Sequence, residues 1–166
     1  MIKTARDAGS PLQLIETIID VNMTRRKAML MKIITACGGS VQARRIAVWG
    51  LTFKPDTDDI RESPALPIIA GLIDAGDNVC AFDPEGMVNA RDLETGAEFA
   101  PNQYDAAAGA DALVLVTEWQ SFRSPDFVRL GSLMKKRIVV DLRNALSPME
   151  AQRHGFIYVG IGLGDS

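Results

Sequence analysis

A charged loop follows the first apolar strand pattern and holds much of the candidate chemistry. Lys54 and Arg61 in this loop could donate hydrogen bonds to phosphate oxygens. The loop leads to a predicted helix start at Ser63 and Pro64, and a helix N-terminus favours anions. Only Gly50 stands where a dinucleotide-binding loop carries its GxGxxG pattern, so the dinucleotide fingerprint is absent. The loop therefore predicts a local phosphate contact of another kind.

Three aspartates in the same loop allow further interpretations. Asp56, Asp58 and Asp59 could offer carboxylate oxygens to a hard cation. We favour the alternative that they form turns and pair with the two cations of the loop, and we expect no metal site. A phospho-receiver domain would need an acid directly after the first strand and an aspartate at the end of the third. The third predicted strand ends instead in Thr117 and Glu118, which disfavours that class.

Other polar and aromatic residues are weaker candidates. Arg143 directly follows a predicted strand, where a planar guanidinium suits a phosphate or a base edge, although a surface salt bridge accounts for it equally well. His154 lies at a predicted helix C-terminus, where the helix dipole explains it as well as catalysis would. We expect Trp119 and Phe122 to be wall or core residues rather than a base-stacking platform.

Alternating strand and helix patterns position these residues. The predicted strands are residues 46–49, 78–82, 112–117, 138–141 and 156–159, and the predicted helices are 65–75, 104–109, a helix capped by 124–126 that runs to 133, and 148–154. Apolar strands that alternate with helices predict an α/β fold with a Rossmann-like, doubly wound parallel sheet. Ligands bind beyond the carboxyl ends of such strands, where the loops 51–62, 117–119 and 141–144 fall. Residues 85–102 are the least predictable stretch.

A long α-helix precedes this sheet. Ser10 and Pro11 predict its start, and Gly38 and Gly39 its end. At 1.5 Å per residue the helix is about 40 Å long, more than one small domain needs. It could be an ordinary amphipathic helix of the next domain, but its length and excess apolar surface favour an interdomain or dimerisation helix. We therefore expect two parts, a helical segment at 1–40 and a Rossmann-like domain at 41–166.

The composition excludes several other classes. The chain has 166 residues, of which 47% are hydrophobic, and a net charge of -3, so it can bury a core and has no global attraction for nucleic acid or an anionic membrane. Cys37 and Cys80 lack CxxC spacing and fit reduced thiols of a cytoplasmic protein. No apolar run reaches transmembrane length, and the N-terminus lacks the apolar core of a signal peptide.

Three motifs resemble one enzyme family. Residues 50–65 read GLTFKPDTDDIRESPA and closely resemble the signature of UDP-glucose 6-dehydrogenases. Residues 110–119, ADALVLVTEW, and 141–144, DLRN, are similar to later motifs of the same UDP-glucose/GDP-mannose dehydrogenase family. The resemblance spans nearly the whole chain, as a central dimerisation helix followed by a C-terminal UDP-binding domain. The wording of 53–57 and 117–119 is most similar to the UDP-glucose branch; dehydrogenases of GDP-mannose or UDP-N-acetylhexosamines, and a stand-alone nucleotide-binding module, remain alternatives.

The resemblance implies an enzyme that oxidises UDP-glucose to UDP-glucuronate with two NAD+. Phe53, Lys54 and Arg143 would contact the UDP-sugar, Arg61 would reach NAD held mainly by another domain, and the helix would form a homodimer. The family's GxGxxG domain and its catalytic cysteine motif, which precedes the first helix, have no counterpart here. Neither cysteine of the chain can take that role. We therefore expect a fragment with no catalytic residue and no dehydrogenase activity of its own.

Overall fold

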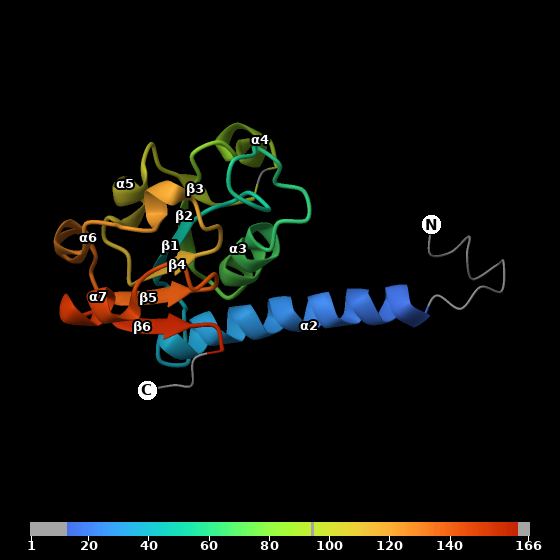
Figure 1. Ribbon diagram of the computed structural model, residues 1–166, viewed down its shortest axis with the longest axis horizontal. Coiled ribbons are helices and arrows are strands. Elements are labelled where there is room, and N and C mark those ends of the chain that lie inside the picture. The colour runs from blue at the N-terminus through green and yellow to red at the C-terminus, as the bar shows by residue number, and fades with distance from the viewer. Residues whose placement is uncertain (1–12, 94, 163–166) are drawn as a thin grey trace.

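The computed structural model describes residues 13–93 and 95–162, with side chains from residue 21 onward. Its elements, labelled as in Figure 1, are α2 (Gln13–Ala36), β1 (Arg45–Trp49), α3 (Ala65–Asp74), β2 (Asn78–Phe82), α4 (Met87–Arg91), β3 (Glu98–Phe99), α5 (Gln103–Ala107), β4 (Ala112–Leu115), the 3₁₀ turn η1 (Gln120–Phe122), α6 (Phe127–Leu133), β5 (Ile138–Asp141), α7 (Pro148–Arg153) and β6 (Ile157–Gly160).

The six strands form one all-parallel sheet in the order β3-β2-β1-β4-β5-β6. Chain order runs outward in one direction from β1 and in the other from β4, so the strand order reverses between these two central strands. This arrangement confirms the predicted doubly wound α/β fold. In such sheets a crevice opens beyond the carboxyl ends of the strands at the point of reversal.

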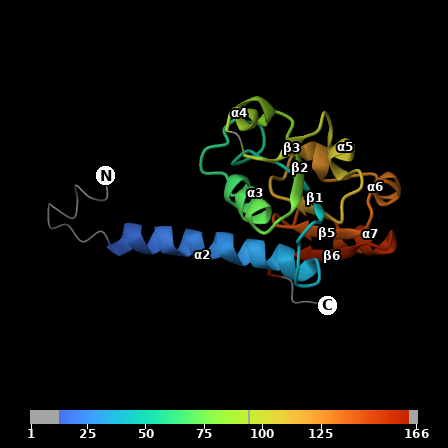
Figure 2. The same cartoon turned by 180° about the vertical axis from the view of Figure 1, so that it is seen from behind.

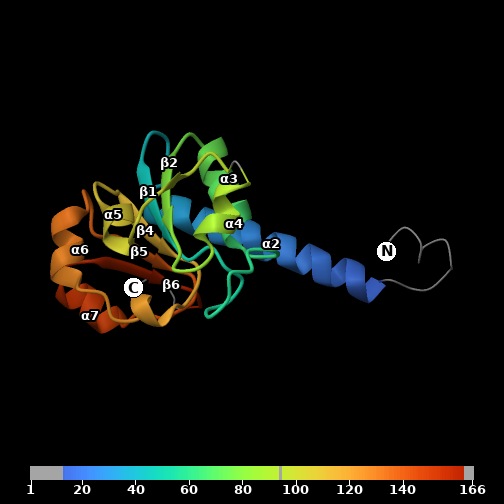
Figure 3. The ribbon, with the colours of Figure 1, turned by 90° about the horizontal axis from the view of Figure 1, so that it is seen from above.

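Helices cover both faces of the sheet, as the view from above shows (Figure 3). Because side chains alternate along a strand, β1 directs Ile46 and Val48 into one core and Ala47 and Trp49 into the other. Helices α2, α3 and α4 contribute to the first core, and α5, α6 and α7 contribute to the second. The inner strands β1, β4 and β5 are thus buried on both faces, as the sequence predicts. The edge strand β6 was expected to be buried as well but is not, since Ile157 is 60% exposed.

Helix α2 runs from the sheet far beyond the rest of the described chain (Figures 1 and 2). Its C-terminal part is anchored, because Ile33 is fully buried and Leu30 packs on Gly71 of α3, where a Cβ would lie 2.6 Å from a Leu30 methyl carbon. Val21 and Met23 lie on the extended part and are 47% and 51% exposed. The predicted helix start at Ser10 and Pro11 lies outside the described residues.

Side-chain caps fix the starts of two later helices. Asp126 accepts a hydrogen bond from the Arg129 amide at 3.0 Å at the start of α6, and Ser147 accepts one from Glu150 at 3.3 Å at the start of α7. In the unpredictable stretch 85–102 the structure places α4 and the two-residue edge strand β3. Among the described residues, no helix is long and apolar enough to span a membrane.

Candidate functional site

Three loops meet at the carboxyl edge of the central strands. The loop after β1 joins the loop after β4 where the Thr117 hydroxyl donates to the Thr52 carbonyl at 2.6 Å. The loop after β5 is linked to the end of β4 by a hydrogen bond from the Leu142 amide to the Leu115 carbonyl at 3.0 Å. The structure therefore brings together the three loops that the sequence places at this edge.

Gly50 makes the turn out of β1 possible. Its φ is +95°, in the region that favours glycine, and a Cβ at this position would lie 2.5 Å from both the amide nitrogen and the Cβ of Thr117. Neither atom belongs to the end of a flexible side chain, so neither could move away easily. The single glycine of this loop thus serves the close approach of β1 and β4.

Asp83, directly after β2, holds the site together, although it is not among the residues predicted from the sequence to be functional. Its carboxylate is fully buried and accepts six hydrogen bonds. Oδ2 accepts from the Leu51 amide at 2.6 Å, the Thr52 amide at 3.1 Å, the Thr52 hydroxyl at 3.2 Å and the Trp119 indole at 3.0 Å, and Oδ1 accepts from the Glu85 and Gly86 amides at 3.0 and 2.7 Å. An acid at the end of an inner parallel strand was the available signal.

Phe53 and Lys54 lie on the exposed part of the loop after β1. Both side chains are exposed, while the Phe53 amide donates to the Asp59 carbonyl at 2.9 Å and closes the loop. Asp56 adopts a φ of +61°, which agrees with its expected role as a turn former. Among the described residues Lys54 has no ion pair, so the expected pairing with the loop's aspartates is not found there. This part of the loop therefore presents the Phe53 ring and the Lys54 ammonium to solvent.

Arg61 pairs with Asp59, as the sequence predicts. Its Nε and Nη2 donate to the two carboxylate oxygens of Asp59 at 2.9 Å each, and its side chain remains 86% exposed. Hydrogen bonds from the Arg61 side chain and amide lower the pKa of Asp59 to about 2. The pair is therefore ionised at neutral pH, but its solvent exposure keeps it weak.

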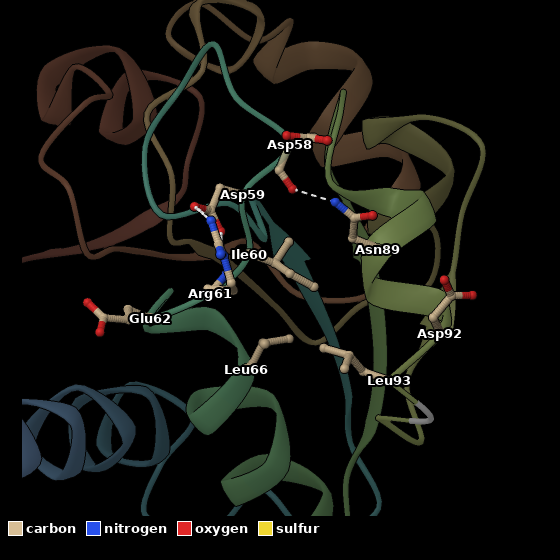
Figure 4. Close-up of a pocket in the computed structure, with 9 residues that line it drawn as sticks. All are labelled: Asp58, Asp59, Ile60, Arg61, Glu62, Leu66, Asn89, Asp92 and Leu93. Carbon is tan, nitrogen blue, oxygen red and sulfur yellow. Dashed lines mark hydrogen bonds and ion pairs between the residues drawn. The ribbon is translucent and has the colours of Figure 1, made fainter. Parts of the chain in front are cut away.

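Arg61 lines a groove of about 510 Å³ between this loop, the start of α3 and α4 (Figure 4). Asn89 of α4 donates to the Asp58 carbonyl at 2.9 Å and ties one side of the groove to the other. The lining combines apolar and charged side chains. Its residues are Asp58, Asp59, Ile60, Arg61, Glu62, Leu66, Asn89, Asp92 and Leu93.

Arg143 forms an ion pair with Glu118, so the loops after β4 and β5 are joined by charge. Arg143 Nη2 donates to Glu118 Oε1 at 2.6 Å, and Arg143 Nε donates to Oε2. The hydrogen bonds from Arg143 lower the pKa of Glu118. The salt bridge considered for Arg143 is thus present, and its acidic partner was not predicted.

Hydrogen bonds to the Asp141 carboxylate hold the loop that carries Arg143. The buried Asp141 carboxylate accepts from the Arg143 amide at 3.0 Å, from the Leu146 amide at 2.8 Å and from the Tyr158 hydroxyl at 3.0 Å. Burial and the charge of Asp141 raise the pKa of Tyr158, so this hydroxyl stays protonated and donates. The backbone position of Arg143 is therefore well defined.

The remaining candidates lie away from this edge or within the core. His154 follows α7 near the amino ends of the strands and stacks on Phe127, with ring centroids 5.9 Å apart. Trp119 and Phe122 are buried, which agrees with their expected place as wall or core residues. Within the described part of the chain, no three His, Cys, Asp or Glu side chains are grouped so that they could hold a metal ion.

An open parallel sheet with its polar loops gathered at the strand-order reversal defines a Rossmann-like nucleotide-binding domain. Residues 47–148, more than half of the chain, match the family model described as UDP-glucose/GDP-mannose dehydrogenase family, UDP binding domain. The chain belongs to this family.

Known relatives place the chain more closely. It is 51% identical to the UDP-glucose 6-dehydrogenase of Rhizobium meliloti (strain 1021) over 165 residues, which are 99% of this chain and 38% of that protein. It is 38% identical to the UDP-glucose 6-dehydrogenase of Pseudomonas aeruginosa, over 98% of this chain and 37% of that protein. The chain thus spans less than two fifths of the length of these relatives.

Solved structures share the fold. A UDP-glucose dehydrogenase from Pyrobaculum islandicum superposes with a TM-score of 0.78 over 96% of this chain and 34% of that chain, at 24% identity. A UDP-D-ManNAc dehydrogenase from Pyrococcus horikoshii gives a TM-score of 0.64 over 86% of this chain and 31% of that chain, at 27% identity. At 24% identity, the likeness to the Pyrobaculum islandicum protein shows a shared fold alone.

Proposed function

We propose that this chain is the UDP-sugar-binding portion of an NAD-dependent dehydrogenase that oxidises UDP-glucose to UDP-glucuronate. The observation that carries the proposal is the exposed Phe53 and Lys54 on a loop held at the carboxyl edge of the central strands, in a chain of this family. The 51% and 38% identical relatives are both UDP-glucose 6-dehydrogenases, which favours this sugar over GDP-mannose or a UDP-N-acetylhexosamine.

Three side chains would contact the UDP-sugar. Lys54 supplies a mobile ammonium for phosphate oxygens, and Arg143 supplies a planar guanidinium with further N–H donors beyond those given to Glu118. Phe53 supplies an exposed apolar face. Glu118 would share Arg143 with the ligand, which keeps the guanidinium oriented before binding.

NAD would be held mainly outside this chain. The turn after β1 has a single glycine, so it lacks the pattern that lets a backbone approach a pyrophosphate closely. Arg61 is the residue of this chain suited to reach the cofactor, because its exposed guanidinium lines an open groove. NAD accepts hydride when bound. This chain's part is to bind and orient the sugar nucleotide.

The chain alone is proposed to be inactive. Covalent thiol catalysis needs an activated cysteine, yet Cys37 and Cys80 are both buried, and burial raises the pKa of both thiols. These free, buried thiols support a place in the reducing cytoplasm. The exposed apolar residues of α2, among them Val21 and Met23, support a homodimer formed through this helix. The end of α2 before Gly38 and Gly39 supports the proposed division of the chain at residue 40 into a helical segment and a UDP-binding domain.

A calorimetric titration of UDP into the chain tests the binding site. Lys54→Ala and Arg143→Ala should each weaken binding by about tenfold, since each removes a charged hydrogen-bond donor. Lys135→Ala is the matched control, because Lys135 is an exposed cation that precedes β5, at the amino ends of the strands and away from the site. Equal affinity in all four proteins, or no UDP binding by the unmodified chain, would refute the proposed site. NADH formation from UDP-glucose by the pure chain would refute its proposed inactivity.

A further inference from the structure

We propose that Asp83 is the positioning residue of the substrate loop, residues 51–62, and that it thereby denies this domain the ribose-binding acid of a dinucleotide site. The inference rests on the proposed UDP site at this loop. It concerns a side chain that contacts no ligand in that proposal and acts through the backbone of the loop.

The hydrogen bonds of Asp83 join three separate segments. One carboxylate oxygen accepts from the Leu51 and Thr52 amides of the substrate loop and from the Trp119 indole after β4. The other accepts from the two amides that precede α4, the helix on the far side of the groove in Figure 4. Asp83 is therefore the common acceptor of the loop, the central strand end and the groove wall.

This network sets where the proposed ligand contacts begin. Leu51 and Thr52 directly precede Phe53 and Lys54, and the Thr52 carbonyl is itself held by the Thr117 hydroxyl. With both the amides and the carbonyl fixed, the chain enters the exposed part of the loop in one direction. Such preorganisation strengthens binding, because the loop does not have to be ordered when the ligand arrives.

The same network bears on which nucleotide this domain can take. In dinucleotide-binding Rossmann units an acid downstream of the first βα turn accepts hydrogen bonds from a ribose. Asp83 is an acid in a comparable place, because it follows β2, the strand next to β1. A carboxylate has about four lone-pair sites, and Asp83 already receives six donors. It is also fully buried, with the Trp119 indole against it. No acceptor remains for a ribose hydroxyl.

Three variants of the chain test this role. Asp83→Asn replaces the acceptor, Trp119→Phe keeps an aromatic ring but removes the indole donor, and Asp74→Asn is the control, an exposed acid of α3. Amide hydrogen exchange is measured without ligand, and UDP and NAD are each titrated by calorimetry. Thermal unfolding reports global stability in parallel.

We expect the Leu51 and Thr52 amides to exchange at least about tenfold faster in Asp83→Asn, and UDP binding to weaken about tenfold, because a charged acceptor is lost. In Trp119→Phe we expect smaller changes in the same direction, namely faster exchange of the Leu51 and Thr52 amides and weaker UDP binding. The amides of β5 should not show an equal increase in exchange. Asp74→Asn should match the unmodified chain. If Asp83→Asn does not fold, Trp119→Phe carries the test.

Unchanged exchange at Leu51 and Thr52 in the folded variants would overturn the positioning role. NAD binding by the unmodified chain that is lost in Asp83→Asn would overturn the ribose argument. Failure of the unmodified chain to bind UDP would refute the proposed function instead, while the exchange experiment, which needs no ligand, would still decide the role of Asp83.

Discussion

Gly50 and Thr117 are in such close contact that the space between β1 and β4 admits no side chain at position 50. A Cβ on Gly50 would lie 2.5 Å from the Thr117 amide nitrogen, and the φ of +95° is itself unfavourable for other residues. The two constraints act on the turn from which the substrate loop departs. The contact therefore links the packing of the central strands to the position of Phe53 and Lys54.

We predict that Gly50→Ala lowers the free energy of unfolding by about 2 to 4 kcal/mol, since it combines backbone strain with a steric clash. Gly38→Ala is the matched control, because Gly38 has a φ of +88° but no atom of the described residues within 4 Å of an added Cβ. It should cost only about 1 kcal/mol. Urea unfolding measures both. Equal losses would mean that strain alone acts and that the close approach to Thr117 is unimportant.

Asp77 should make the chain less stable above pH 6. Its side chain is 7% exposed, one carboxylate oxygen has no hydrogen-bond partner among the described residues, and burial raises its pKa from 3.8 to about 6. A carboxyl group whose pKa is raised on folding stabilises the folded state while it is protonated. This contribution is complete below the unfolded pKa and is lost as the pH rises through about 6.

We therefore predict that Asp77→Asn raises the free energy of unfolding at pH 8 by on the order of 1 kcal/mol, with a smaller gain at pH 4. The Arg44 amide, which donates to Asp77 at 3.3 Å, can still donate to the new amide oxygen. The difference between variant and unmodified chain, measured by urea unfolding across this range, removes the opposite contributions of Asp59 and Glu118. A gain that is larger at pH 4 than at pH 8 would contradict the prediction.

The sequence predicted the strands well because each is a short apolar run with clear ends. Residues 78–82 and 138–141 were predicted with the bounds that the structure has, and the predicted strand 156–159 differs by one residue at each end. Helix α4 and strand β3 were missed because residues 85–102 show neither helical nor strand periodicity. The edge strand β3 pairs with β2 over only two residue pairs. Pairing in the folded protein, rather than a local sequence pattern, therefore defines this strand.

Pairwise relations within the site were harder to predict than its location. The rule that parallel sheets bind ligands at their carboxyl edge placed the three loops together. It could not show that Asp83 would accept donors from the loops of two other strands, because Asp83-Pro84 indicates by itself only the end of a strand. In the same way, the sequence placed Arg143 at this edge but not Glu118 against it, since their loops are separated by a strand and a helix.

Arg61 should be dispensable for UDP binding by this chain. Its guanidinium is 86% exposed and pairs with Asp59, two residues earlier, rather than with the loops after β4 and β5. We predict that Arg61→Ala changes the UDP affinity by less than about twofold, as expected for an exposed ion pair. Calorimetry with Lys54→Ala in parallel provides the comparison. A loss as large as that of Lys54→Ala would move Arg61 from the proposed cofactor side to the sugar-nucleotide side.

The exposed face of α2 predicts self-association. Met23 and Met31 are 51% and 57% exposed on a helix whose first part extends beyond the sheet. Because about half of each side chain is exposed, its burial would stabilise an interface by about 1 kcal/mol, half of the value for a fully exposed side chain. We predict that Met23→Glu shifts the chain from dimer to monomer in analytical ultracentrifugation, since a buried, unpaired charge opposes association. Val128→Glu is the control, because Val128 is a 67% exposed apolar residue on α6, away from α2. Val128→Glu should remain dimeric. A dimer that Val128→Glu disrupts and Met23→Glu leaves intact would place the interface on α6 and contradict the proposed role of α2.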